Sequence, residues 1–137
     1  MTKVIYDNWF LISGKFPIDD HTKGALAVLD WAYSQYSDEK LVYASSFGAE
    51  AIVLIDLIYK INQNAQIVFW DTDLHFPETY DVIEQVESHY PSLNIERRKA
   101  NLSLDEEAAE FGTALWKRDP NRCCQLRKAN PLREEII

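Results

Sequence analysis

The stretch QIVFWDTDLHFPETY, residues 66–80, decides the fold because it joins a strand, a polar loop and the start of a helix. Its first residues form a short apolar run with β-branched and aromatic side chains, as in a strand covered on both faces. Acid, hydroxyl and imidazole groups follow at once. Pro77 then suits the first turn of a helix that runs to about Tyr90, where Pro91 ends it. The stretch therefore predicts one strand–loop–helix unit.

Similar patterns lie on both sides of this unit. Two further buried strands are predicted, at residues 41–45 and 93–98. The first is a short apolar run that we expect to be covered on both faces, whereas the second is polar enough to lie at a sheet edge. Helical spacing of apolar residues predicts helices at 22–36 and 49–61, and a capping box at 103–106 opens a helix that Gly112 ends. Because helices and strands alternate, we expect an α/β fold with a parallel sheet and helices on both faces.

Length and composition indicate one globular domain over residues 1–137. The chain is 47% hydrophobic with a net charge of −8, which argues against a general nucleic-acid binder. No apolar run approaches the roughly 20 residues of a membrane helix, and no apolar leader follows Met1. The two cysteines are neighbours, which fits the reducing cytoplasm. Since residues 131–137 resemble a helix just starting, and three strands make a small sheet, we expect a fragment of a longer protein.

Charge is unevenly distributed along the chain. Residues 1–96 carry 5 Lys and Arg against 15 Asp and Glu, whereas residues 97–137 carry 9 against 7. A solvated basic face and a local anion site both explain this segment.

The loop SSFGAE is the first candidate site. It comprises Ser45, Ser46, Phe47, Gly48, Ala49 and Glu50, between a predicted strand and a predicted helix. Its small residues let the backbone approach a ligand, and free N–H groups at a helix N-terminus favour anionic oxygens. Many strand-to-helix turns contain Ser and Gly for steric reasons alone, so this alternative stays open.

The second candidate is the loop after residue 70, with the polar residues Asp71, Thr72, Asp73 and His75. The alternative is a structural role, in which Asp71 and Thr72 form turns and Glu78 lies in the first turn of a helix. Ligands of open parallel sheets bind beyond the carboxyl ends of the strands. Two polar loops at adjacent strand ends therefore favour a nucleotide or phosphate site.

The third candidate is the pair Cys123 and Cys124, followed by Arg127 and Lys128. Thiolates bind soft metals, and nearby cations stabilise negative charge. Iron–sulfur clusters generally need four thiolates, so this chain supplies at most half of such a site. Alternatively, both cysteines are small buried apolar residues.

Taken together, SSFGAE at 45–50, DTDLHFPETY at 71–80 and the segment 103–132 resemble the assimilatory sulfonucleotide reductases. This family reduces adenylyl sulfate or phosphoadenylyl sulfate. The resemblance implies an adenine-nucleotide α-hydrolase-like fold of the PP-loop type, here with its C-terminal part missing. It implies a cytoplasmic enzyme of sulfate assimilation and cysteine biosynthesis that releases sulfite and AMP, or adenosine 3′,5′-bisphosphate, with thioredoxin as reductant.

Residue roles follow from the same resemblance. Residues 45–50 match the modified phosphate loop, and Asp71, Thr72, Asp73 and His75 match the loop lining the nucleotide pocket. Cys123 and Cys124 match half the ligands of a four-iron four-sulfur cluster, and Arg127 and Lys128 match the basic pair facing the substrate's anionic groups. The cysteine pair favours adenylyl sulfate, although some cluster-bearing members use both substrates.

Departures from the family pattern are also visible. Asp73 replaces a glycine, a change that Asp tolerates at positive φ, and Ala51 replaces a commonly acidic residue. The second cysteine pair and the nucleophilic cysteine of the family are missing, so we expect this chain to be inactive and to lack an intact cluster. Two rival interpretations are a PP-loop ATP pyrophosphatase or adenylyltransferase and a non-catalytic nucleotide-binding module. Self-association is left open.

Overall fold

The computed structural model describes residues 16–17, 19–36 and 40–136. The predictions about the leader after Met1 and about Ile137 lie outside these residues. Five elements come first along the described chain, in the order α2 (His21–Gln35), β1 (Val42–Ala44), α3 (Ala49–Ile61), β2 (Gln66–Asp71) and α4 (Pro77–His89). They are followed by β3 (Asn94–Lys99), α5 (Leu104–Phe111), α6 (Leu115–Arg118), α7 (Pro120–Cys124), the π-helix η2 (Gln125–Ala129) and α8 (Asn130–Ile136).

The three strands form a parallel sheet in the order β1-β2-β3. The predicted parallel sheet is thereby confirmed, as is the edge position of the polar strand β3. The predicted burial of the first strand was wrong, because β1 is the other edge strand of the described sheet. Val42 is 38% exposed and Ala44 is exposed as well, whereas most of β2 is buried. Only β2 has a described strand on each side.

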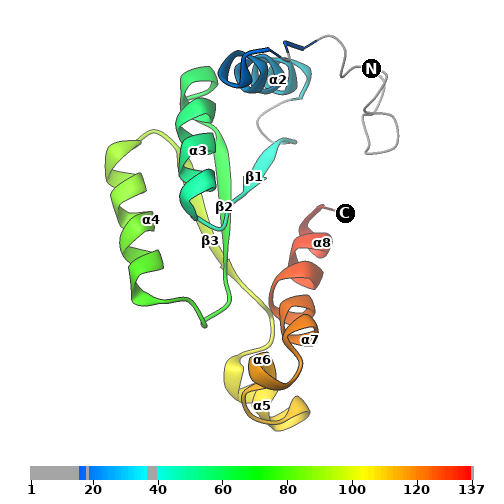
Figure 1. Ribbon diagram of the computed structural model, residues 1–137. Coiled ribbons are helices and arrows are strands. Elements are labelled where there is room, and N and C mark those ends of the chain that lie inside the picture. Colours follow the sequence, from blue (N-terminus) through cyan, green and yellow to red (C-terminus); the bar gives the residue numbers. More distant parts are fainter. Residues whose placement is uncertain (1–15, 18, 37–39, 137) are drawn as a thin grey trace.

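Helices lie on both sides of the sheet. Figure 1 shows α3 and α4 together on one side of the sheet and α8 on the other side, with α5 and α6 beyond the end of β3. The helix α2 packs against α3 at the opposite end of the molecule. This arrangement places the carboxyl ends of the strands next to the segment α5–α8. That segment carries the predicted cysteine pair and the basic pair that follows it.

The core lies between β2 and the two helices α3 and α4. Its fully buried aliphatic side chains are Ile55 and Ile58 of α3, Ile67 of β2 and Ile83 of α4. The rings of Phe47 and Phe69 pack edge to face, with centroids 5.7 Å apart. Burial of these apolar groups is the main force that holds α3 and α4 on the sheet.

The predicted capping box opens α5. The Ser103 hydroxyl accepts a hydrogen bond from the backbone N–H of Glu106 at 3.1 Å, and Gly112 ends the helix with φ 88°. The helix predicted to start at residue 131 is confirmed as α8, but the helical run before it was not predicted. Helical structure runs from Pro120 to Ile136, because Asp119 caps α7 at its first turn and a π-turn carries the chain into α8.

Candidate nucleotide site

The first loop leaves the end of β1 and leads into α3. The N–H of Ser45 continues the sheet by donating to the carbonyl of Val68 at 2.9 Å, and the Ser45 hydroxyl accepts from the N–H of Phe47 at 3.1 Å. That short turn gives Phe47 a φ of 59°, which is rare for a large side chain. The Phe47 ring lies in the core, so any contact of Phe47 with a ligand would fall to its backbone.

Gly48 is the N-cap of α3 and brings no capping side chain. Its φ is an ordinary −74°, and a Cβ there would meet nothing closer than 3.7 Å. The N-cap residue of α3 therefore accepts no side-chain hydrogen bond from the N–H groups of the first turn. Open backbone N–H groups at a helix start suit an anionic oxygen.

The second loop is held by its own side chains. The carboxylate of Asp71 accepts from the N–H of Asp73 at 2.8 Å, and the hydroxyl of Thr72 accepts from the N–H of Leu74 at 3.3 Å. Asp71 and Thr72 are both buried, and Asp73 has φ 61°. These contacts confirm the predicted turn-forming role of Asp71 and Thr72. They also confirm that Asp73 occupies a turn at positive φ.

Asp71 has a second donor, Tyr80 in the first turns of α4. The Tyr80 hydroxyl donates to Asp71 Oδ1 at 2.7 Å. Burial acts to raise the pKa of Asp71, but the hydrogen bonds from Tyr80 and from the Asp73 N–H hold that pKa below its usual value. Burial and the same hydrogen bond raise the pKa of Tyr80 to about 12. The pair therefore holds a charged carboxylate and a neutral phenol at neutral pH.

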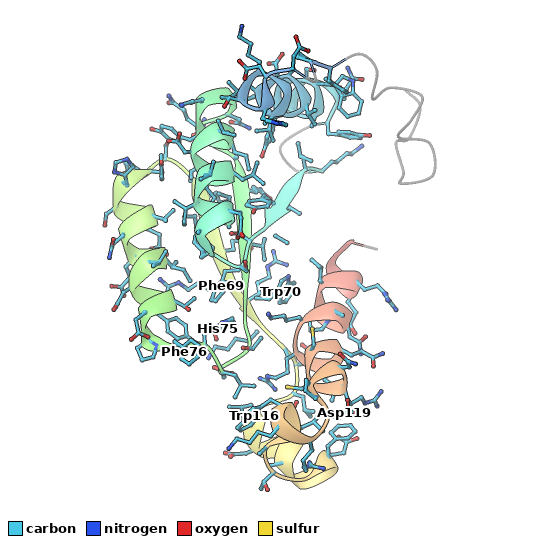
Figure 2. All side chains as sticks on the ribbon, viewed as in Figure 1. Phe69, Trp70, His75, Phe76, Trp116 and Asp119 are labelled. Atoms are coloured by element: carbon cyan, nitrogen blue, oxygen red, sulfur yellow. The ribbon has the colours of Figure 1, made fainter. Side chains whose placement is uncertain are left out.

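His75 lies in the loop between β2 and α4. Its ring packs on Phe69 with centroids 4.8 Å apart, and its Nε2 lies 3.3 Å from the carbonyl oxygen of Trp70. Figure 2 shows Phe69, Trp70 and His75 gathered at this end of the strand, with Phe76 farther out beside α4. These contacts fix the orientation of the His75 ring.

The cysteine segment comes from the other side of the sheet. Cys123 is buried, and Cys124, one residue further on α7, is exposed. Burial raises the pKa of the Cys123 thiol, and the nearby carboxylate of Glu107 adds to this effect. Adjacent positions on a helix point in different directions, so the two thiols have different surroundings.

A cavity of about 220 Å³ joins these three segments. Its walls come from the first loop, from the end of β2, from His75 and from the helical segment after Cys123. The lining residues are Ala44, Ser45, Ser46, Phe69, Trp70, His75, Cys124, Lys128, Ala129 and Leu132. Five predicted site residues therefore share one cavity, although more than 80 positions separate Ser45 from Lys128. This convergence is the central observation about the site.

The other predicted site residues do not line this cavity. Ala49 and Glu50 are exposed on the first turn of α3, and Cys123 and Arg127 are buried. Sequence reasoning missed Trp70 and Leu132 as lining residues. The spacing of four between Cys124, Lys128 and Leu132 is a signal that could have placed all three on one helix face.

Comparison with known protein families agrees with the resemblance seen in the sequence. Residues 40–137 match the model of the phosphoadenosine phosphosulfate reductase domain. The chain belongs to this family.

Curated relatives and a solved structure agree with this assignment. The chain is 59% identical over 131 residues to adenosine 5′-phosphosulfate reductase 1 of Bacillus subtilis, covering 96% of this chain and 56% of the relative. It is 58% identical over 132 residues to adenosine 5′-phosphosulfate reductase of Geobacillus thermodenitrificans, with the same coverage. The crystal structure of phosphoadenylyl-sulfate reductase from Candida auris, a phosphate complex, superimposes with a TM-score of 0.70 at 25% identity. That match covers 98% of this chain and 63% of the other. The chain thus spans about half the length of these curated relatives.

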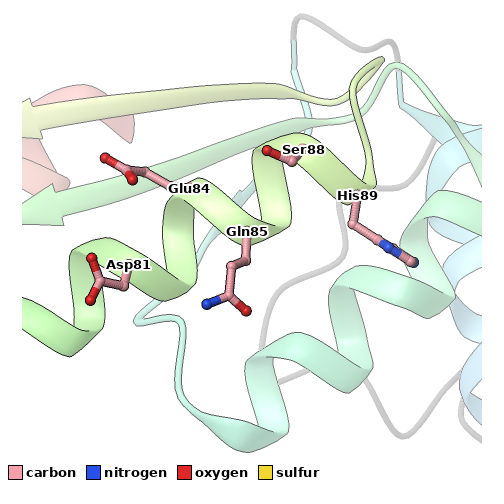
Figure 3. Close-up of a pocket in the computed structure, with 5 residues that line it drawn as sticks. All are labelled: Asp81, Glu84, Gln85, Ser88 and His89. Atoms are coloured by element: carbon pink, nitrogen blue, oxygen red, sulfur yellow. The ribbon is translucent and has the colours of Figure 1, made fainter.

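A second hollow of the described structure lies on the solvent-exposed side of α4. It has a volume of about 580 Å³ and is lined by Asp81, Glu84, Gln85, Ser88 and His89. Figure 3 shows all five side chains on that one helix. None of the predicted site residues belongs to it.

The two thiols do not make a complete metal site. Among the described residues, no group of three or more His, Cys, Asp or Glu side chains could hold a metal ion. A four-iron cluster generally needs four thiolates, and the sequence contains two cysteines. An intact cluster therefore does not fit the residues present. Nor does any helix in the described part of the chain have the length and apolar character needed to cross a membrane.

Proposed function

We propose that the chain is the nucleotide-binding part, one domain over residues 1–137, of a cytoplasmic adenylyl-sulfate reductase of sulfate assimilation and cysteine biosynthesis. The cavity between the two loops and the cysteine segment carries this proposal. The names of the curated relatives support adenylyl sulfate as the substrate, and the phosphoadenylyl form is the alternative. Thioredoxin as reductant and self-association belong to the same proposal for the whole protein.

The cavity combines groups that suit a sulfated nucleotide. Phe69, Trp70 and Leu132 offer apolar and aromatic surface for a base or ribose, and the hydroxyls of Ser45 and Ser46 offer hydrogen bonds to anionic oxygens. Lys128 lines the same cavity as Cys124, so its ammonium group supplies a positive charge for the anionic oxygens of the ligand. Asp71, Thr72 and Asp73 shape the loop that carries His75. In the longer protein, Cys123 and Cys124 would be two of the four thiolates of a cluster.

Calorimetric titration of the chain with adenylyl sulfate and with AMP tests the proposal. We expect adenylyl sulfate to bind more tightly, because only its sulfate adds a further anionic group facing Lys128. Lys128→Ala should reduce this preference by about tenfold, the effect of losing one charged hydrogen bond. Lys117→Ala, which removes an exposed lysine of α6, is the matched control and should change nothing.

Other outcomes of the same titration would favour other functions. Equal affinities for the two ligands would indicate a non-catalytic binding module, and magnesium-dependent release of pyrophosphate from ATP would indicate the PP-loop enzyme class. Either result would overturn the proposal. With reduced thioredoxin and adenylyl sulfate, this chain should form no sulfite, because it lacks the family's nucleophilic cysteine.

A further inference from the structure

Arg127 is the largest of the fully buried side chains in the described part of the chain. Its side chain is 1% exposed, and it does not line the cavity that Lys128 and Cys124 share. Burial of a guanidinium group is costly unless its N–H groups find acceptors. The partners of Arg127 therefore reveal what the residue does.

These partners come from segments far apart in the sequence. Nε donates to the carbonyl oxygen of Thr72 at 2.7 Å, and Nη1 donates to the carbonyl oxygen of Leu102 at 3.0 Å. Nη2 donates to Asp73 Oδ2 at 3.4 Å. All three nitrogens of the guanidinium group thus bond to the backbone or side chain of two loops.

A buried carboxylate adds to this arrangement. Glu107 of α5 is 2% exposed, and its Oε1 lies 3.8 Å from Arg127 Nη1. The oxygen has no hydrogen-bond partner of its own, so its compensation within this cluster is electrostatic. Arg127 therefore joins η2 to α5 as well as to the two loops.

From these contacts we infer that Arg127 is a positioning residue that fixes the loop from Asp71 to His75 against the cysteine segment. The resemblance to the family's basic pair predicted that Arg127 faces the substrate directly. The present inference replaces that role with a positioning role. A guanidinium that already bonds Thr72, Leu102 and Asp73 has to break these bonds before it can reach into the cavity. Lys128, the next residue, lines the cavity instead. Only the statement about the substrate rests on the proposed function, because the contacts of Arg127 do not involve a ligand.

Arg127→Lys separates the two roles because it keeps the charge and removes the planar fork. A lysine retains one positive charge beside Glu107 but has a single nitrogen, which cannot bond three acceptors in the geometry of a guanidinium. If Arg127 only supplied charge to the substrate, the lysine variant would keep most of the affinity and leave the loop unchanged. The matched control is Arg122→Lys, the same substitution at an exposed residue of α7.

Amide hydrogen exchange is the readout that does not depend on substrate. In Arg127→Lys, the amides of Asp73 and Leu74 should exchange at least about tenfold faster, because their turn loses its anchor at Thr72. Affinities for AMP and adenylyl sulfate should then fall by the same factor, so that their ratio stays within about twofold. Arg122→Lys should change neither quantity.

The opposite pattern would overturn the inference. Unchanged exchange at Asp73 and Leu74 together with a selective loss of adenylyl sulfate affinity would make Arg127 a direct ligand. Failure of both nucleotides to bind even the unsubstituted chain would remove the proposed function, but the exchange result would still decide the positioning role.

The unsubstituted protein gives a second measurement in case the lysine variant does not fold. The Nε–H proton of Arg127, observed by nitrogen-15 NMR, should exchange slowly with water in the free protein and remain protected, at nearly the same shift, when adenylyl sulfate is added. Rapid exchange in the free protein, or loss of protection on adding the nucleotide, would contradict the inference.

Discussion

Tyr80 and Asp71 form a hydrogen bond of 2.7 Å between the first turns of α4 and the end of β2. This bond ties the helix that follows the second loop to the strand that precedes it. The loop is thereby closed at both ends, and its geometry depends on a carboxylate that stays charged and a phenol that stays neutral.

Tyr80→Phe should lower the free energy of unfolding at neutral pH by about 1 kcal/mol, because Asp71 loses one of its donors. The contribution of Asp71, whose pKa is lowered, is present above its unfolded value of 3.8 and is lost as the pH falls below that value. The contribution of Tyr80 is present below its unfolded value of 10 and is lost as the pH rises from 10 to about 12. Urea unfolding across these pH ranges checks the direction.

An absorbance titration separates the two late-titrating tyrosines. Tyr90, hydrogen-bonded to Asp56, also has a pKa raised to about 12. Tyr80→Phe should therefore remove the ionisation of Tyr80 near 12 and leave that of Tyr90. If the difference in stability between Tyr80→Phe and the unsubstituted chain stayed constant up to pH 12, the raised pKa would be wrong.

Phe47→Ala should destabilise the protein by about 3 to 5 kcal/mol, because it opens a cavity against Phe69 in the core. Phe76→Ala is the matched control. Its side chain is 77% exposed, so its loss should change the free energy of unfolding by less than about 0.5 kcal/mol. Urea denaturation of both variants measures the difference. Comparable effects of the two substitutions would show that the Phe47 ring does not lie in the core.

Cys124 should react with iodoacetamide faster than Cys123 in the folded chain. Cys124 is exposed, whereas Cys123 is buried and its pKa is raised by burial and by Glu107. Tandem mass spectrometry of the peptide that carries both residues locates the label. In denaturing urea the two rates should become similar, and preferential labelling of Cys123 in the folded chain would contradict the described orientation of α7.

The sequence predicted the helices and strands well where local patterns were strong. The bounds of α3 and β2 agree with the expected ranges because apolar residues at helical spacing and a run of β-branched and aromatic residues leave little choice. The capping box of α5 was equally clear, since Ser103 and Glu106 have the spacing that the hydrogen bond needs. The helical run after Pro120 was not recognised, because its short turns carry no long apolar period.

Within the site, the sequence predicted which residues take part better than where their side chains point. The sequence singled out Ser45, Ser46, His75, Cys124 and Lys128, and all five line one cavity. It could not show that Phe47 turns its ring inward or that Arg127 turns away from the cavity, because both depend on contacts with distant residues. The carbonyl of Thr72 that receives Arg127 has no signature in the sequence.

The wide turn of η2 also affects how α8 is rotated about the helix axis relative to α7. In η2 the N–H of Asn130 bonds to the carbonyl of Gln125, five residues back, so this turn contains one residue more than an α-turn. The wide turn absorbs this extra residue, so deleting one residue there would leave a regular α-helix in which α8 keeps nearly its present rotation relative to the turn that carries the thiols. A further inserted residue that the turn did not absorb would rotate α8 by roughly 100°. Leu132 would then leave the wall that it shares with Cys124. Between residues 125 and 129, a single-residue insertion should therefore harm the site more than a single-residue deletion.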